Sequence, residues 1–352
     1  MSKKIAINGF GRIGRIFFRQ AFDSADLDII AINDLGSPEN LAYLLKYDTV
    51  YGNYDRVVET LEENGKSYIV VSPTSHEASK GAQKKQILFL SEKDPGKLPW
   101  KDLGIDIVVE STGVFESRDK AAPHLDAGAK RVVITAPAKD EITPTVTPNV
   151  NVEALKLDKI TSNASCTTNA ATPVMSVMMA NPGVEKAALN TVHGYTASQG
   201  LVDGPDPRNK DYRRARAAAM NIVPTSTGAA LAATRAIPPL KDKFDGIALR
   251  VPVISGSIMD FTFLASRKTS IEEINEIFKK AAQQENWKGI LTVTDEPIVS
   301  SDILRNPHGS IVDLAMTRVI DGDLVKVLAW YDNEWGYGAM LTRHVLTVAS
   351  IL

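Results

Sequence analysis

The chain has 352 residues, enough for about two domains, and 44% of them are hydrophobic and 23% charged. This ordinary globular composition excludes a disordered, collagenous or coiled-coil protein. The 40 Lys and Arg against 42 Asp and Glu leave a net charge of −2, which excludes a basic field for nucleic acid or acidic lipid. The chain has a single Cys and therefore no internal disulfide, it has no apolar run of about 18 residues, and its start is unlike a signal peptide. Together these observations predict a soluble, cytoplasmic protein.

The first 34 residues carry the clearest pattern. A short apolar run at 4–8 precedes the glycine motif 9–14 (GFGRIG), a helical pattern and a second apolar run at 28–32. A strand, glycine turn, helix and strand in this order begin a parallel sheet. Further strands are predicted at residues 87–90, 105–110 and 131–135. The polar segment 116–129 predicts a crossover helix, and residues 1–165 are interpreted as an open α/β domain.

The second half groups its strands and has few helices. Strands are predicted at residues 247–253, 258–265 and 325–330. Ser270 and Glu273 form a capping box that predicts a helix, and 332–352 ends the chain with a helical pattern. The grouping predicts an α+β domain with a mainly antiparallel sheet.

Two segments lack periodicity. The polar stretch 72–86 predicts a solvated loop or a hairpin tip. Residues 200–220 contain two prolines and several arginines. A loop of about 20 residues in a compact protein is usually functional, and a solvated surface loop is the alternative.

The glycine motif predicts a dinucleotide site. Gly9, Gly11 and Gly14 lie between a predicted strand and helix, and Asp34 ends the next strand 20 residues later. The glycines let the backbone approach a pyrophosphate at a helix N-terminus, and Asp34 would bind ribose hydroxyls and repel a 2′-phosphate. NAD is therefore favoured over NADP, although Gly36 leaves room for a mixed preference. The alternative is a tight turn with a solvated Asp.

Cys166 lies in the segment SNASCTTN, before a helix-like run. A cysteine at a helix N-terminus has its thiolate stabilised by free backbone N–H groups, so we expect a nucleophile near neutral pH. The alternative is a small buried hydrophobic residue. Pro173 predicts a kink or a late start of this helix.

A thiolate nucleophile needs a base nearby, and the chain has five His. His193 follows an apolar stretch and precedes the arginine-rich loop, which makes it the first candidate. His308, between Pro and Gly, is its rival. His76, His124 and His344 are interpreted as surface or packing residues.

Arginines and hydroxyls indicate an anion site. Arg250 lies inside an apolar strand, where it needs an anionic partner, and a structural ion pair is the alternative. Further candidates are Arg213, Arg214, Arg216, Thr196, Thr225, Ser226 and Thr227. No metal site is expected.

Eight segments occur in the order found in one family: INGFGRIGR, YDT, STGVF, SNASCTTN, HGYT, NIVPTSTGAA, LRVP and WYDNEWGY. Through them the chain resembles the phosphorylating, NAD-dependent glyceraldehyde-3-phosphate dehydrogenases over nearly its whole length. The resemblance implies a Rossmann-type NAD-binding domain (1–165), an inserted catalytic domain (166–331) and a C-terminal helix (332–352) that returns to the first. It also implies a homotetramer and a place in glycolysis and gluconeogenesis.

The resemblance implies a chemistry for Cys166 and His193. Cys166 attacks the aldehyde carbon of glyceraldehyde 3-phosphate to give a thiohemiacetal, and His193 acts as the base. Hydride loss to the cofactor leaves a thioester, which inorganic phosphate cleaves to 1,3-bisphosphoglycerate. The thioester retains the oxidation energy that hydrolysis would dissipate.

Binding residues follow from the same resemblance. Thr196 and Arg250 are implied to hold the substrate's phosphate, and the attacking phosphate is assigned to Ser165, Thr167, Arg213, Thr227 and Gly228. The implied cofactor contacts are Gly9, Phe10, Gly11, Arg12, Ile13, Gly14, Asp34, Lys93, Thr135 and Asn333. Asn333 is implied to orient the nicotinamide amide. Ala170 departs from the second Cys of many members, and Lys93 from a more usual Arg.

Two alternatives remain open. An erythrose-4-phosphate dehydrogenase shares the glycine motif and SNASCTTN, but the retained Thr196, Thr227 and Gly228 favour phosphorylating chemistry. A non-catalytic, NAD-binding or redox-sensing protein would use Cys166 only as an oxidisable thiol. That alternative leaves Arg250 and the hydroxyl clusters unexplained.

Overall fold

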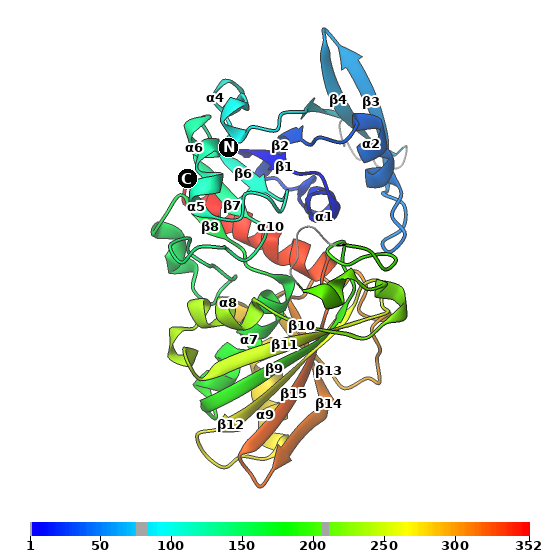
Figure 1. The fold of residues 1–352 in the computed structure, drawn as a ribbon. Coiled ribbons are helices and arrows are strands. Elements are labelled where there is room, and N and C mark those ends of the chain that lie inside the picture. Colours follow the sequence, from blue (N-terminus) through cyan, green and yellow to red (C-terminus); the bar gives the residue numbers. More distant parts are fainter. Residues whose placement is uncertain (1, 75–83, 206–210) are drawn as a thin grey trace. The chain divides into compact units, whose positions relative to one another are not determined.

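The computed structural model describes residues 2–74, 84–205 and 211–352 (Figure 1). The chain divides into two compact units, each of which is described by itself. Unit 1 comprises Met1–Pro144, Glu153–Asn163 and Leu341–Leu352. Unit 2 comprises Thr145–Val152 and Ala164–Met340.

Within its described residues, unit 1 contains an eight-stranded sheet in the order β3-β4-β5-β2-β1-β6-β7-β8. The strands are β1 (Lys3–Asn8), β2 (Leu27–Asn33), β3 (Arg56–Glu63), β4 (Lys66–Pro73), β5 (Lys85–Leu90), β6 (Ile107–Glu110), β7 (Arg131–Ile134) and β8 (Ile160–Ser162). Neighbours from β5 to β8 are parallel, whereas β4 pairs antiparallel with β3 and β5. The parallel part confirms the predicted α/β sheet and places the carboxyl ends of β1, β2 and β6 at one edge.

Helices of unit 1 are α1 (Arg12–Ala21), α2 (Pro38–Lys46), α4 (Trp100–Leu103), α5 (Arg118–Ala121) and α6 (Pro123–Asp126), with short 3-10 turns η1 (Pro95–Lys97) and η2 (Val152–Lys156). The single crossover helix expected over 116–129 is wrong. Two one-turn helices form instead, because Pro123 has no N–H with which to continue the hydrogen bonding of α5.

The polar stretch 72–86 connects β4 to β5, which are antiparallel neighbours. Residues 75–83 of it, His76 among them, lie outside the described residues, as do 206–210 of the arginine-rich loop. The rest of that loop has two short 3-10 turns, η3 (Tyr212–Ala215) and η4 (Ala218–Met220).

Unit 2 contains a seven-stranded sheet among its described residues, in the order β10-β11-β9-β12-β15-β14-β13. The strands are β9 (Val184–Gly194), β10 (Val223–Ser226), β11 (Phe244–Val251), β12 (Ser257–Ala265), β13 (Leu291–Thr294), β14 (Ser310–Ile320) and β15 (Leu324–Tyr331). The β9–β11 and β13–β14 pairs are parallel and the other four antiparallel, so the sheet is mainly antiparallel as predicted.

Helices of unit 2 are α7 (Cys166–Ala180), α8 (Ala229–Ala236), α9 (Ile271–Ala282) and the first part of α10 (Trp335–Ser350), with 3-10 turns η5 (Pro238–Leu240) and η6 (Glu285–Trp287). The Ser270 hydroxyl accepts from Glu273 N at 3.2 Å, which confirms the predicted start of α9. A late start of α7 is wrong: the helix begins at Cys166 and contains Pro173.

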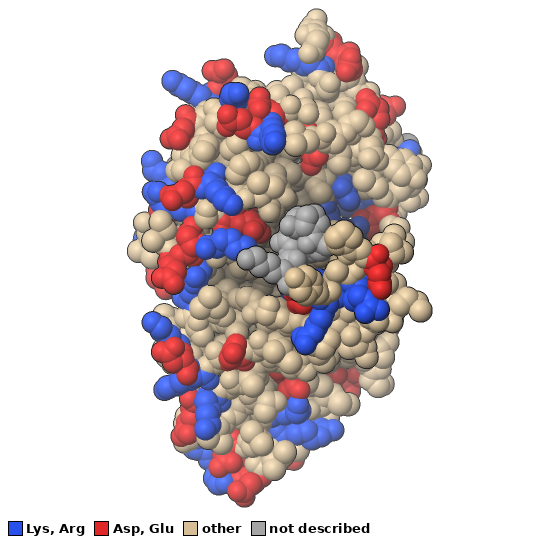
Figure 2. Space-filling model, viewed as in Figure 1, with Lys and Arg blue, Asp and Glu red and all other residues tan. Residues whose placement is uncertain are grey.

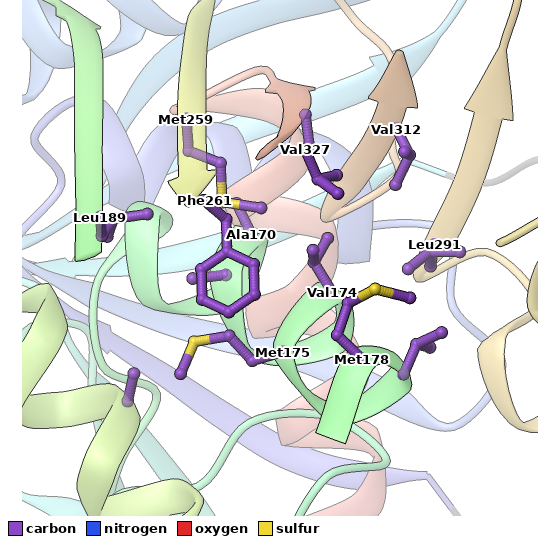
Figure 3. Packing of buried hydrophobic residues seen from close by; sticks show 14 of the residues in the cluster. Ala170, Val174, Met175, Met178, Leu189, Met259, Phe261, Leu291, Val312 and Val327 are labelled. Carbon is purple, nitrogen blue, oxygen red and sulfur yellow. The ribbon is translucent and has the colours of Figure 1, made fainter. Parts of the chain in front are cut away.

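The core of unit 2 lies between α7 and one face of the sheet (Figure 3). Val174, Met175 and Met178 of α7 meet strand residues such as Phe261 and Val327, all of them buried. Truncating a buried side chain such as Phe261 to Ala costs about 3–5 kcal/mol of unfolding free energy. This packing holds α7, and with it Cys166, rigidly on the sheet.

Acidic and basic side chains are interspersed over the face shown in Figure 2. Among the described residues on that face, no field of one sign dominates, in agreement with the near-zero net charge. None of the helices in the described ranges is both long and apolar enough to cross a membrane.

Candidate active site

Cys166 occupies the first helical position of α7 in unit 2. Ser165 caps the helix, because its hydroxyl accepts from Thr168 N at 3.1 Å. The cap leaves the first backbone N–H groups of the helix next to the thiol, where their partial positive charge stabilises a thiolate.

His193 lies near the end of β9, and its Nε2 is 3.3 Å from Cys166 Sγ. On its other side, Nδ1 lies 2.6 Å from the Gly194 carbonyl oxygen. The Gly194 carbonyl can only accept from Nδ1, whereas the Arg250 guanidinium, which also contacts Nδ1, can only donate to it, so the two contacts favour opposite tautomers. The role of a base requires the tautomer whose Nδ1–H donates to the carbonyl, which leaves Nε2 as an acceptor facing the thiol. The rival candidate for the base does not share this position: His308 instead lies 2.9 Å from the Asn306 side chain.

Arg250 lies beside His193 because β9 and β11 run parallel, with Arg250 and His193 as register partners. Its Nη1 lies 2.5 Å from His193 Nδ1 and donates to the Gly194 carbonyl at 3.0 Å. Its buried Nε has no hydrogen-bond partner among the described residues. A buried guanidinium without a carboxylate is suited to an incoming anion.

Burial sets the protonation of the pair. Burial, and after it the nearby Arg250 charge, lowers the pKa of His193 to about 3. Burial also raises the pKa of the Cys166 thiol, against the opposite effect of Arg250. Both directions favour the uncharged forms, a thiol beside an imidazole that can accept its proton. The expectation of a nucleophile near neutral pH, based on the helix N-terminus, stays a prediction.

Tyr331 belongs to the same cluster, although the sequence did not single it out. Its hydroxyl lies 2.9 Å from the Thr167 hydroxyl and 2.7 Å from that of Thr191. Its ring packs edge-on against His193, with centroids 5.9 Å apart. Tyr331 thereby fixes the orientation of the imidazole and of the Thr167 hydroxyl. Its sequence signals were its place directly after the predicted strand 325–330 and within the segment WYDNEWGY.

In unit 1, the glycine motif forms a turn between β1 and α1. Gly9 has φ of +91°, and a Cβ there would come within 2.6 Å of Thr112 N. A Cβ on Gly14 would lie 2.3 Å from the Gly9 carbonyl oxygen. Both positions therefore require glycine, as a turn that admits a pyrophosphate does.

Asp34 follows β2 and faces this turn. Its Oδ2 accepts from Phe10 N at 2.6 Å and its Oδ1 from Gly36 N at 2.8 Å. The carboxylate is thus held beside the glycine turn, where a dinucleotide's ribose is recognised.

Comparison with known proteins agrees with both sites. Residues 3–118 match the family described as "Glyceraldehyde 3-phosphate dehydrogenase, NAD binding domain" and residues 165–333 the one described as "Glyceraldehyde 3-phosphate dehydrogenase, C-terminal domain". The chain belongs to the glyceraldehyde-3-phosphate dehydrogenase family. The resemblance drawn from the eight sequence segments is confirmed.

Relatives match over their full length. The chain is 45% identical over 350 residues to glyceraldehyde-3-phosphate dehydrogenase 2 of Bacillus subtilis (strain 168), covering 98% of this chain and 97% of that protein. Identity is 44% over 355 residues to the glyceraldehyde-3-phosphate dehydrogenase of Zymomonas mobilis, and 48% over 360 residues to that of Mycobacterium tuberculosis (strain ATCC 25618 / H37Rv), with 100% of both chains covered in each case. The chain is therefore an NAD-dependent oxidoreductase of this family. Neither erythrose-4-phosphate dehydrogenase nor a non-catalytic protein is favoured.

The residues of this dehydrogenase fit NAD. The glycine turn and Asp34 lie as described above, and the side-chain Oδ1 of Asn333 in unit 2 accepts from Gly256 N at 3.0 Å and from the Ser257 hydroxyl at 2.8 Å. Because Oδ1 accepts both of these hydrogen bonds, the Asn333 amide N–H₂ is the part of the side chain that can donate to a ligand.

The other expected cofactor residues of unit 1 differ in their surroundings and exposure. The Arg12 guanidinium donates two hydrogen bonds, of 2.6 and 3.2 Å, to the Asp48 carboxylate. These hydrogen bonds engage its side chain within unit 1. Lys93 is exposed in the loop after β5, and Ile13 is half-buried at the start of α1. Thr135 follows β7, and its N–H donates to the Glu110 carbonyl.

The arginine-rich loop of the dehydrogenase brings Arg214, rather than Arg213, toward the catalytic cluster. Arg214 Nε donates to the Thr225 hydroxyl at 2.8 Å, and its charge lowers the pKa values of His193 and Arg250. The Arg213 side chain is exposed, and its N–H donates to the Asp211 carboxylate. Of this loop's arginines, Arg214 therefore adds to the charge of Arg250 near the imidazole.

The hydroxyl candidates of unit 2 lie in two places. Thr227 accepts from Ala229 N at 3.2 Å, beside Gly228 at the start of α8. Thr196 follows β9, and its hydroxyl lies 2.9 Å from that of Ser198. The exposed Arg216 instead forms an ion pair with Asp203.

Proposed function

We propose that this enzyme oxidises glyceraldehyde 3-phosphate to 1,3-bisphosphoglycerate in glycolysis and gluconeogenesis, with Cys166 as the nucleophile and His193 as the base. The observation that carries the proposal is the 3.3 Å contact between Cys166 Sγ and His193 Nε2 at the start of α7. A nucleophile and base within hydrogen-bond reach, with the base oriented by further groups, are what covalent catalysis requires.

The first step is attack on the aldehyde. His193 Nε2 takes the thiol proton as Sγ bonds to the carbonyl carbon, and the imidazolium proton then goes to the oxygen, which gives the thiohemiacetal. A neutral imidazole is required here, and the low pKa of His193 keeps it neutral at physiological pH.

When bound, NAD would supply the hydride acceptor for this oxidation. His193 removes the hydroxyl proton as the thiohemiacetal carbon loses its hydride and becomes the carbonyl carbon of the thioester. A phosphate oxygen then attacks the thioester carbon, and Cys166 leaves as the thiolate. His193 returns its proton to Sγ, so the enzyme ends the cycle as it began.

Phosphate groups need cationic and hydroxyl partners. We assign the substrate's own phosphate to Thr196 and Arg250, whose Nε is buried without a partner among the described residues. We assign the attacking phosphate to Ser165, Thr167, Thr227 and Gly228, and for its cationic partner we propose Arg214 in place of the Arg213 that the resemblance implies. The pKa effects on His193 and Arg250 support Arg214 in this role.

The cofactor is assigned to two sets of residues. In unit 1 these are Gly9, Phe10, Gly11, Arg12, Ile13, Gly14, Asp34, Lys93 and Thr135. In unit 2, Asn333 donates to the nicotinamide carboxamide. For Arg12 we propose a contact through its backbone N–H at the start of α1, since Asp48 holds its guanidinium.

A homotetramer in the cytoplasm, with 1–165, 166–331 and 332–352 as its domains, completes the proposal. Support for an oligomer comes from large apolar side chains of the 200–222 segment that are 68–87% exposed: Leu201, Val202, Tyr212, Met220 and Ile222. Large apolar side chains left exposed along one segment are typical of an interface between subunits.

The deciding experiment is NADH formation from glyceraldehyde 3-phosphate and NAD with and without inorganic phosphate. Rapid turnover that depends on phosphate is expected. Turnover indifferent to phosphate would indicate hydrolysis of the thioester, and no turnover would contradict the proposal.

A further inference from the structure

A chain of buried side-chain hydrogen bonds runs along the carboxyl ends of three neighbouring strands of unit 1. Asn33 ends β2, and its Nδ2 donates to Asn8 Oδ1 at 2.7 Å. Asn8 ends β1, and its Nδ2 donates to Glu110 Oε2 at 2.5 Å. Glu110 ends β6. All three side chains are buried, and the mechanism proposed above uses none of them.

Glu110 is the centre of this network. Its side chain is 1% exposed. Besides Asn8, His124 Nε2 contacts Oε2 at 3.1 Å, and Oε1 accepts from both the N–H of Thr112, at 2.9 Å, and the Thr112 hydroxyl. A buried carboxylate is stable only with such partners, and here four donors surround it.

Trp100 fixes the role of His124. The indole Nε1 can only donate, and it lies 3.0 Å from His124 Nδ1. Nδ1 must therefore accept, so a neutral His124 carries its proton on Nε2 and donates it to Glu110. The fully buried imidazole is thus a second donor that points the carboxylate toward Thr112.

The segment that follows Glu110 forms one wall of the glycine turn. The Ser111 hydroxyl donates to the Gly9 carbonyl at 2.5 Å, and Thr112 N lies 2.6 Å from where a Gly9 Cβ would be. Gly14 also faces this segment, since its Cβ would lie 3.1 Å from Ser111 Oγ. The turn therefore keeps its shape only while residues 110–112 keep theirs.

We propose that Glu110 is a positioning residue for NAD binding. It acts through Ser111 and Thr112, whose backbone and hydroxyl hold Gly9 in the conformation that receives the pyrophosphate. Trp100 and His124 support it from the opposite side. Glu110 takes no part in the chemistry at Cys166.

Glu110→Gln tests the proposal with little change in side-chain size. The new amide has only one oxygen to accept hydrogen bonds. In one orientation its N–H₂ faces the donors of Asn8 and His124, and in the other it faces the donors of Thr112. Leaving a buried donor unpaired is expected to raise the dissociation constant of NAD about tenfold, measured by calorimetry on protein stripped of nucleotide. KM for NAD should rise equally, while kcat at saturating NAD stays within about twofold.

Asp106→Ala is the matched control, because it loosens the same two strands at their other ends. Asp106 precedes β6, and its carboxylate accepts from Lys4 N of β1 at 2.8 Å and from Lys130 Nζ at 2.6 Å. A lower melting temperature with unchanged NAD affinity is expected. If this variant weakens NAD as much as Glu110→Gln, the network contributes only stability and the proposal is wrong.

Two further variants test the proposal in case Glu110→Gln folds poorly. In Asn8→Asp combined with Glu110→Gln, the amide and carboxylate exchange places. The carboxylate introduced on β1 then accepts from His124 and from the amide introduced on β6, so most of the NAD affinity should return.

Trp100→Phe removes only the donor to His124 and should raise the dissociation constant of NAD about threefold. Wild-type NAD affinity in Glu110→Gln or Trp100→Phe, or a double variant no tighter than Glu110→Gln, would overturn the proposal.

Discussion

The glycine turn of unit 1 and the cysteine cluster of unit 2 are built in different ways. The turn consists of backbone atoms from one short segment, and its shape rests on the missing Cβ atoms of Gly9 and Gly14. The cluster consists of side chains from α7, β9 and β11, and burial and charge among them change the pKa values of all its members. Loss of one side-chain charge should therefore weaken binding at the turn only moderately, whereas in the cluster it changes the protonation of the catalytic pair itself.

Cys166→Ser should give the largest difference between the two regions, because it should stop turnover at the cysteine cluster and leave NAD binding at the glycine turn intact. The hydroxyl is similar in size to the thiol but much less acidic, and an alkoxide is a far poorer leaving group than a thiolate when phosphate cleaves the acyl-enzyme. We expect kcat to fall by at least about 10⁴-fold, as for nucleophiles that act with a base. NAD affinity, measured by calorimetry, should change by less than about twofold. Surviving turnover would exclude the thiol mechanism.

Arg250→Ala should act on substrate binding and on His193 together. Loss of the phosphate partner should raise KM for glyceraldehyde 3-phosphate about 100-fold, and KM for unphosphorylated glyceraldehyde only slightly. Equal effects on both would indicate a structural arginine.

The pH profile gives a second measurement of the same variant. His193 must be neutral to act as a base, and its pKa is lowered to about 3, so in the wild type it loses activity only in strong acid. Removing the Arg250 charge raises that pKa. The acidic limb of kcat/KM should therefore move to higher pH, and an unmoved limb would show that Arg250 does not act on the imidazole.

The turn was predictable from sequence because its information is local. Glycine spacing, the strand before it and the position of Asp34 all lie within 34 residues. Two hairpins could have been predicted in the same way: Asn64-Gly65 between β3 and β4, and Asp321-Gly322 between β14 and β15. All four residues have positive φ, as turns of this kind require.

The cluster was predictable only as a set of candidates. His193 was separated from His308 by the position of β9 against α7, and Arg250 reaches it through the β9–β11 register. Neither relation can be inferred from the spacing of residues in the sequence. The neighbours Arg213 and Arg214 look alike in sequence, and only the fold of the loop turns one toward Thr225 and leaves the other exposed.

Arg214→Ala compared with Arg213→Ala should sharpen this distinction. Arg214 lies close enough to His193 and Arg250 to lower their pKa values, so its loss should raise KM for inorganic phosphate about tenfold. The exposed Arg213 should change it by less than about twofold. The reverse order would support the sequence-based assignment of Arg213.

Asp34 should have the smallest and most specific effect, on the choice between NAD and NADP. Its carboxylate both repels a 2′-phosphate and accepts from Phe10 N at 2.6 Å in the glycine turn. Asp34→Asn keeps an acceptor for that N–H and removes the charge, whereas Asp34→Gly removes both. The ratio of kcat/KM for NAD over NADP should fall about tenfold in both variants, because both lose the repulsion. NAD affinity should fall further in Asp34→Gly alone, because only there is the turn left without its acceptor. An unchanged cofactor ratio would show that Asp34 serves the turn and does not face the ribose.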